Sequence, residues 1–152
     1  LRQKLVQDTL EEMRTGRQDS FGFEKLVKSV LQSLGGENVT IVPRSKDQGA
    51  DITALFTVAD TFSFTVAAQA KHYRETPEVP PKDVEQLRDG MDAEGATLGW
   101  LVTSGTFSEE TEELKNEIED ETGYEIQLVD GEQLAALIVD GGLRAASLTE
   151  DE

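Results

Sequence analysis

The side chains with the clearest chemical potential are two carboxylates, one amide and one lysine: Glu24, Asp51, Gln69 and Lys71. Carboxylate and amide oxygens are hard ligands of the kind that Mg²⁺ binds while it keeps several waters. Hydrolysis of a phosphodiester needs a positioned water, charge stabilisation at phosphorus and help for the leaving oxygen. The four side chains could therefore form one metal-dependent phosphodiesterase site, provided that the fold brings them together.

Two strands must position three of these side chains. Apolar residues alternate along 52–58 and again along 62–70, which is the period of half-buried strands. A hairpin with 58 opposite 62 matches apolar to apolar throughout, and a slip of one residue would destroy the match. The same register sets Asp51 opposite Gln69, about 5 Å apart at Cβ, with Lys71 two residues on. The turn fits less well, because a three-residue loop favours a left-handed glycine and only Asp60 offers a substitute.

Glu24 is expected on an amphipathic helix over residues 20–34. Apolar residues recur there at intervals of three and four, a capping residue stands before them, and two glycines follow. Glu24 lies beside Phe23 at the margin of the apolar stripe. The alternative is a solvated glutamate paired with Lys28 one turn later, since most helical glutamates are exposed.

The rest of the sequence predicts an α/β fold. Further helices are expected at 1–14, at 83–93, after the capping residue Ser108 and at 131–139, and further strands at 38–42, 98–103 and 124–129. The glycine pair at 141–142 should end the last helix. Strands that alternate with helices pair in parallel, so the second half should add parallel strands to the antiparallel hairpin. The expected architecture is a mixed sheet flanked by helices.

Five short stretches carry a family resemblance. They read GFEKLV at 22–27, DQGADI at 47–52, QAKHY at 69–73, GWLVTSGTFS at 99–108 and LVDGEQL at 128–134. None is specific alone, but together they lie in the right order over about residues 20–138. The sequence thus resembles the catalytic domain of the Mrr-type restriction endonucleases, a branch of the PD-(D/E)xK nuclease superfamily. The resemblance implies a restriction-endonuclease-like core whose antiparallel hairpin carries the active site.

The resemblance also implies a role for each residue of the site. Asp51 would bind a metal directly, and Gln69 would add a ligand where most of the superfamily has Glu or Asp. The Ala70 carbonyl would be a further ligand, Glu24 would act as the helical acid and could hold a metal-bound water, and Lys71 would be the catalytic lysine. The cofactor would be Mg²⁺, with Mn²⁺ as a substitute, bound modestly because glutamine is neutral. Glutamine departs from the superfamily pattern but agrees with the Mrr branch.

Four further residues have weaker signals. Lys46 and Arg74 are cations near the site that could contact DNA phosphates. Gln86, on a later helix, could reach the edge of the site or DNA, or simply be solvated. His72 is the only histidine, and strand alternation points it away from the lysine, so we expect a packing residue rather than a base. With no cysteine and one histidine, a Cys/His zinc site is excluded.

The sequence therefore predicts a Mg²⁺-dependent DNA endonuclease domain of type IV restriction, acting on double-stranded DNA that could carry methylation. Two alternatives stay open: a relative of the Holliday-junction resolvases, which usually carry Glu in place of Gln69, and a non-cleaving DNA-binding or interaction module. Double-strand cleavage needs two sites, which favours a homodimer, and a DNA-recognition domain could be missing. We expect a leading helix at 1–18, the nuclease domain at 19–140 and an acidic tail at 141–152, with no membrane partner.

A net charge of −17 is unusual for a protein that binds phosphates. Residues 1–82 hold 11 Lys and Arg against 11 Asp and Glu, whereas residues 83–152 hold 3 against 20. The half with the candidate site is therefore neutral. An acidic excess is an adaptation to concentrated salt, where the screening length is about 3 Å at 1 M. We expect a halophilic cytoplasm, the alternative being an acidic surface that binds a basic partner.

Lowering KCl from about 1 M to a few millimolar should lower the melting temperature, because the charges of residues 83–152 would then repel one another. Calorimetry across a KCl series measures the effect, and a sucrose series controls for general solute effects. A melting temperature that does not change with KCl would remove the halophile interpretation.

Overall fold

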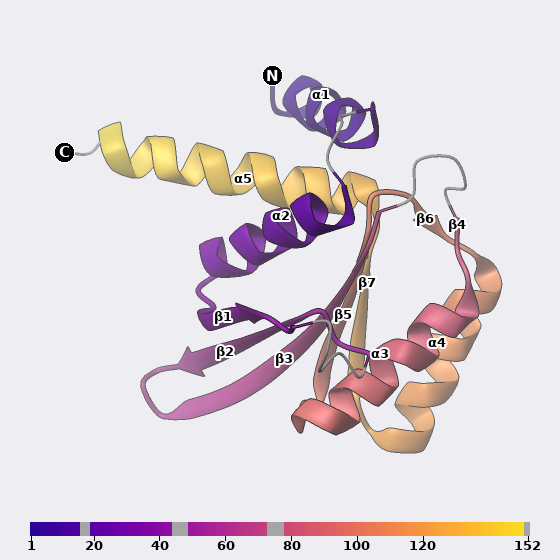
Figure 1. The fold of residues 1–152 in the computed structure, drawn as a ribbon. Helices are drawn as coiled ribbons and strands as arrows, with labels where there is room; N and C mark the ends of the chain where they lie inside the picture. Colours follow the sequence, from indigo (N-terminus) through magenta and orange to yellow (C-terminus); the bar gives the residue numbers. More distant parts are fainter. Residues whose placement is uncertain (16–18, 44–48, 73–77, 151–152) are drawn as a thin grey trace.

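A five-stranded mixed sheet forms the centre of the molecule (Figure 1). The computed structural model describes residues 1–15, 19–43, 49–72 and 78–150, the last eight by backbone alone. The sheet has the order β1-β2-β3-β5-β7 and is built of β1 (Glu37–Ile41), β2 (Ile52–Val58), β3 (Phe62–Lys71), β5 (Leu98–Thr103) and β7 (Glu125–Val129). The first three strands are antiparallel, and β5 and β7 extend the sheet in parallel, as predicted. Two short strands, β4 (Glu78–Val79) and β6 (Thr106–Phe107), pair separately.

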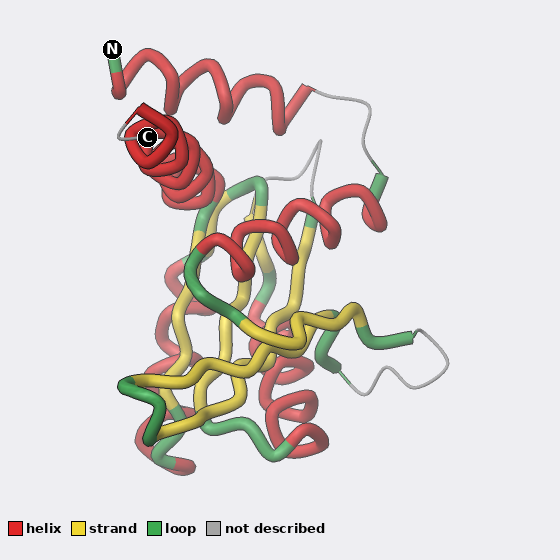
Figure 2. The backbone as a smooth tube through the Cα atoms, turned by 90° about the vertical axis from the view of Figure 1, so that its left-hand side faces the viewer, coloured by secondary structure: helices red, strands yellow, loops and turns green. Residues whose placement is uncertain are grey.

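Helices cover both faces of this sheet (Figure 2). They are α1 (Arg2–Thr15), α2 (Ser20–Ser33), α3 (Pro81–Glu94), α4 (Glu109–Thr122) and α5 (Gly131–Glu150). α2 and α5 lie on one face, with α1 packed over α5, and α3 and α4 lie on the other (Figure 1). No described helix is long and apolar enough to span a membrane.

Each face of the sheet has its own apolar core. On the first face, buried side chains of α1, α2 and α5 meet Ile52 and Ala54 of β2 and Ala68 of β3. On the second, buried side chains of α3 and α4 meet Ala67 of β3 and Leu101 of β5. Even-numbered residues of β3 therefore face α2, and odd-numbered residues face α3. This alternation decides which helix layer each polar side chain of β3 can reach.

The hairpin has the predicted register. Val58 pairs with Phe62 and Ile52 with Ala68, and every position between them follows in step. The turn differs from the expectation, because Ala59 as well as Asp60 is left-handed, with φ of 54° and 52°. The Thr61 amide donates to the Val58 carbonyl at 3.1 Å. Ala59 and Asp60 are therefore the central residues of a type I′ turn, whose twist matches that of the two strands. The strain falls on Ala59, which sequence reasoning did not mark.

The helix ends agree with the sequence at α2 and differ at α5. Asp19 caps α2 by accepting from the Gly22 amide at 2.8 Å, and the chain turns away at Gly35 with φ of 104°. α5, however, does not end at the glycine pair 141–142 but runs on to Glu150. A glycine costs about 1 kcal/mol inside a helix without by itself ending it. The expectation of a short last helix was therefore wrong.

A backbone contact joins the start of β2 to α3. A Cβ atom on Gly49 would lie 2.0 Å from the Gln86 carbonyl oxygen, and one on Gly90 would lie 2.4 Å from the Ala50 nitrogen. Neither position has room for a side chain, so loop and helix touch directly. Gly49 also has φ of 116°, which favours glycine. This contact sets how far Asp51 lies from the side chains of α3.

Gly90→Ala should destabilise the protein by about 2 kcal/mol, since the new methyl group must push the loop away from α3 and overpacking outweighs the better helix propensity of alanine. Urea unfolding measures the change. Gly142→Ala is the matched control: it is also helical, has nothing within 4 Å of its Cβ position, and should stabilise by up to about 1 kcal/mol. A Gly90→Ala protein as stable as the parent would show that the contact is loose.

Candidate active site at the end of the hairpin

Polar side chains from β2, β3 and α3 meet where the hairpin passes under α3. The Asp51 carboxylate accepts a hydrogen bond from the Ala70 amide, with 2.9 Å between Oδ2 and N. The Gln69 amide donates from Nε2 to Gln86 Oε1 at 3.0 Å, and Lys71 Nζ donates to the same oxygen at 3.3 Å. One acceptor on α3 thus binds two neighbouring side chains of β3.

Strand alternation explains this meeting. Gln69 and Lys71 share the face of Ala67, which packs into the core beneath α3. Asp51, one residue before Ile52, belongs to the same side by the register of the hairpin. The structure therefore brings Asp51, Gln69 and Lys71 together with Gln86, over the end of the apolar layer.

Gln69 is a buried amide with one unmet requirement. Its side chain is 4% exposed, and its Oε1 is buried with no hydrogen-bond partner among the described residues, although Nε2 is bound by Gln86. A buried acceptor left unpaired costs about 1–3 kcal/mol. A hard cation could bind this buried amide oxygen together with the neighbouring carboxylate, and so supply the partner that the oxygen lacks among the described residues.

Glu24 stands at the same end of β3 but comes from the other helix layer. It lies in the first turns of α2 and is only 9% exposed, so the alternative of a solvated glutamate does not hold. The ring of its neighbour Phe23 stacks on His72 with 5.2 Å between centroids, which ties this part of α2 to the residue after Lys71.

His72 packs rather than facing the site. Its Nδ1 lies 2.9 Å from Ser104 Oγ, and its ring stacks on Phe23, on the side of β3 opposite Lys71. The Ser104 carbonyl in turn accepts from Arg14 Nε of α1 at 2.8 Å. The packing role predicted for the only histidine is confirmed: His72 links α2 to the loop after β5, and that loop in turn binds α1 through Arg14.

Sequence reasoning overlooked Asp83. This carboxylate is 1% exposed, and its Oδ1 lies 3.9 Å from Lys71 Nζ. In the sequence it reads as an ordinary acid in the first turn of a helix that begins with proline, so no local signal distinguishes it. For Gln86 the sequence left open the edge of the site, DNA or solvent; it binds Gln69 and Lys71, and contact with DNA stays a prediction. Lys46 and Arg74 lie outside the described residues.

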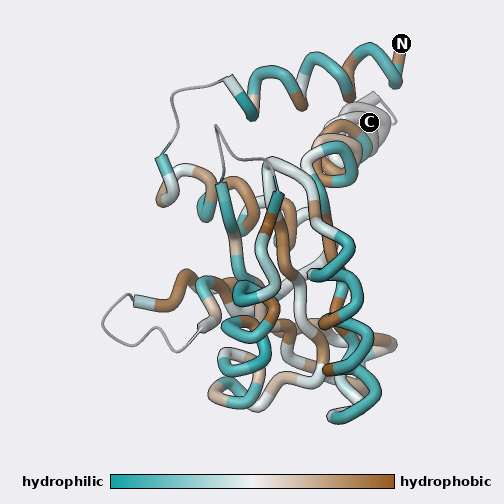
Figure 3. The backbone as a smooth tube through the Cα atoms, turned by 90° about the vertical axis from the view of Figure 1, so that its right-hand side faces the viewer, coloured by the Kyte–Doolittle hydropathy of each residue, from teal (hydrophilic) through white to brown (hydrophobic). Residues whose placement is uncertain are grey.

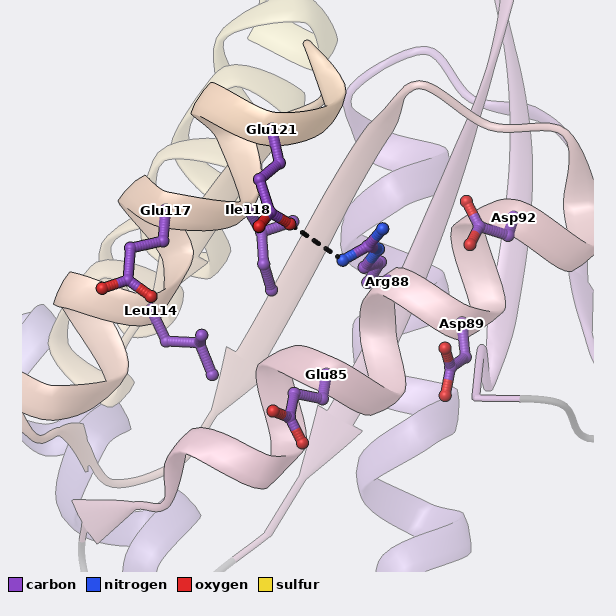
Figure 4. Close-up of a pocket in the computed structure, with 8 residues that line it drawn as sticks. All are labelled: Glu85, Arg88, Asp89, Asp92, Leu114, Glu117, Ile118 and Glu121. Carbon is purple, nitrogen blue, oxygen red and sulfur yellow. Dashed lines mark hydrogen bonds and ion pairs between the residues drawn. The ribbon is translucent and has the colours of Figure 1, made fainter.

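The acidic half of the chain forms its own surface between α3 and α4. A groove of about 490 Å³ there is lined by Glu85, Arg88, Asp89, Asp92, Leu114, Glu117, Ile118 and Glu121 (Figure 4). Arg88 spans it to Glu121 at 3.3 Å. The outer sides of α3 and α4 are largely hydrophilic (Figure 3). Such a lining repels phosphate, so this groove is not a surface for a DNA backbone.

The ligands available for a metal are mixed. Within the described ranges, no group of three or more His, Cys, Asp and Glu side chains is placed to hold a metal ion. A cation near Asp51 would therefore need amide and main-chain oxygens as well. Gln69 Oε1, which has no hydrogen-bond partner in the part of the chain that the structure describes, meets that requirement.

The family model of the restriction endonucleases, which describes the Mrr catalytic domain, matches residues 16–138. The chain belongs to the Mrr-type restriction endonucleases. It is thus a restriction endonuclease domain, and the expected restriction-endonuclease-like α/β core is confirmed. No curated protein matches the sequence significantly.

Solved restriction endonucleases have the same fold. The DNA modification-dependent restriction endonuclease AspBHI has a TM-score of 0.70 at 19% identity, with 93% of this chain and 36% of AspBHI covered. MspJI in complex with a 27-mer oligonucleotide gives 0.57 at 27% identity, with 99% and 36% covered. FokI gives 0.61 at 13% identity, with 90% and 28% covered. This Mrr-type domain therefore spans about a third of the length of these enzymes.

His72→Ala should lower the stability of this Mrr-type domain by about 2 kcal/mol, because it removes both the ring stacking and the hydrogen bond to Ser104. His72→Phe keeps the stacking and should lose about half as much. Urea unfolding compares the two. Equal stability of His72→Ala and the parent would show that the histidine does not join the layers.

Proposed function

We propose that this chain is a divalent-metal-dependent DNA endonuclease of the type IV, Mrr-like kind. The observation that carries the proposal is the buried Oε1 of Gln69, which has no hydrogen-bond partner among the described residues, beside the Asp51 carboxylate and with the Lys71 ammonium on the same face. Family membership makes the chain a nuclease domain, and this cluster is where we place its chemistry.

The residues present fit a hard cation. Asp51 would supply a carboxylate, Gln69 its amide oxygen and Ala70 its carbonyl, and Glu24 would hold a metal-bound water. Mg²⁺, or Mn²⁺ in its place, would supply Lewis acidity and an activated water. Two of the three direct ligands are neutral, so we expect modest affinity. Gln86 holds the Gln69 Nε2, which leaves the amide oxygen rather than the nitrogen for the cation.

Lys71 would act on the phosphate. Its side chain is 28% exposed, so the ammonium can meet both solvent and a bound substrate. A positive charge fixed near the scissile phosphorus stabilises the negative charge that develops in the transition state. It could also orient the attacking water. The role needs an ammonium that stays in one position, which the contacts to α3 favour.

The substrate we propose is double-stranded DNA, with base modification as a feature that is read. AspBHI is described as modification-dependent, and MspJI was solved with an oligonucleotide, which supports this class of substrate. Cleavage of both strands needs two sites, so we propose that the domain acts as a homodimer. Both relatives are far longer than this chain, which agrees with recognition by a separate domain. Such an enzyme would work in the cytoplasm.

A cleavage assay on unmethylated, methylated and four-way-junction DNA tests the function. It should be run in about 1 M KCl, where the screening length is about 3 Å, with Mg²⁺ or Mn²⁺ and with EDTA as the control. Metal-dependent cutting of linear methylated DNA would support the proposal. Preference for the junction would favour a resolvase-like enzyme, and binding without cutting under every condition would leave only a DNA-binding module.

Asp51→Ala and Lys71→Ala should each reduce cleavage at least about 100-fold, because one removes the direct carboxylate and the other a charge aimed at the phosphate. Gln69→Glu should keep the fold and tighten Mn²⁺ binding, measured by calorimetry, since it adds a second carboxylate. Lys115→Ala is the control: that lysine pairs with Glu119 at 2.9 Å on α4, away from the site. Parent-level cleavage by Lys71→Ala would place the catalytic site elsewhere.

A further inference from the structure

We propose that Asp83 is a positioning residue that, together with Gln86, holds the ammonium of Lys71 in place for catalysis. The inference rests on the proposed nuclease function, because it assigns a purpose to contacts of the lysine in that site. Asp83 itself would touch neither the metal nor the DNA.

The two partners of the Lys71 ammonium come from one face of one helix. Asp83 and Gln86 are three residues apart on α3 and therefore lie side by side. Lys71 Nζ lies 3.3 Å from Gln86 Oε1 and 3.9 Å from Asp83 Oδ1. The ammonium thus donates a hydrogen bond to an amide oxygen and forms an ion pair with a carboxylate. The Asp83 amide donates to the Pro80 carbonyl at 3.1 Å, so the carboxylate sits on an ordered first turn.

Burial separates Asp83 from an ordinary acid at a helix start. The first turn of α4 carries Glu109, Glu110 and Glu112, and all three are exposed, as acids that merely favour the helix dipole should be. Asp83 is 1% exposed. Burial of a carboxylate is costly unless the charge is paired and hydrogen-bonded. A dipole role gives no reason to accept that cost, whereas a charge partner for Lys71 does.

The contacts with α3 restrict the rotamers of the Lys71 side chain, whose free movement would slow the reaction. Lysine carries its charge on a flexible four-carbon stem, and each misplaced rotamer takes the charge away from the phosphate. Acceptors on a helix are placed more precisely than acceptors on a loop. α3 is itself held against the start of β2 by the contact of Gly49 with Gln86 and of Gly90 with Ala50. The partners of Lys71 on α3 are thus fixed relative to the loop that leads into Asp51.

Asp83→Asn tests the inference, because it keeps the size of the side chain and removes its charge. We expect kcat to fall about 10- to 100-fold, as for other residues that orient a catalytic group, with KM for DNA and Mn²⁺ affinity unchanged. The matched control is Asp89→Asn, on the outer side of the same helix in the acidic groove, which should leave kcat unchanged. A kcat for Asp83→Asn within twofold of the parent would overturn the proposal.

A double-mutant cycle distinguishes positioning from a general structural role. If Asp83 acts through Lys71, Asp83→Asn should cost nothing further in a Lys71→Met background. The same cycle on melting temperature needs no activity: Lys71→Met should lower it by removing the ammonium that pairs with a buried carboxylate, and the added Asp83→Asn should restore most of the loss. Additive effects in the melting-temperature cycle would overturn the pairing. The parent protein could also cut no DNA while the two substitutions have non-additive effects on melting temperature. That outcome would refute the proposed function, although the pairing of Asp83 with Lys71 would still hold.

Discussion

The close contact between the backbone before β2 and the backbone of α3 is the constraint on which the site depends. Because Gly49 and Gly90 lack side chains, the loop that leads into Asp51 rests directly on the helix. Gln86, whose carbonyl touches Gly49, is thereby brought over β3, where its side chain reaches Gln69 and Lys71. A wider spacing would leave room for larger residues but would move Gln86 and Asp83 of α3 away from Lys71. The two glycines therefore serve the geometry of the site as much as the packing of the core.

The polar cluster works against the stability of the layer in which it lies. Between β3 and α3 the fold buries mainly aliphatic side chains, yet Gln69 and Asp83 are placed beside them with almost no exposure. One amide oxygen has no partner among the described residues, and one buried carboxylate forms an ion pair with a lysine. Sites that violate the local rules of packing in this way are where function is expected to outweigh stability.

Charge is divided between the two sides of α3. Its inner side carries the acceptors for Lys71, and its outer side forms the acidic groove with α4, where Arg88 alone offsets five carboxylates (Figure 4). Phosphate is repelled from that groove, whereas the end of the hairpin presents a lysine. The acidic groove and the end of β3 with Lys71 therefore lie on different sides of α3, and the negative charge of the groove does not line the candidate site.

The sequence by itself determined the strands of the hairpin and their register, the helix that carries Glu24, the mixed sheet and the family. These follow from side-chain periodicity, caps and short motifs, which are properties of neighbouring residues. It also placed Asp51, Gln69 and Lys71 on one face, because opposed positions in a hairpin share a face. The tertiary structure alone decided that Asp83 and Gln86 join them, that Ala59 takes a left-handed conformation and that α5 continues past its glycines. Which side of a helix faces a sheet, and how closely, depends on contacts between segments far apart in the chain, and no local pattern in α3 records that Gly90 meets Ala50.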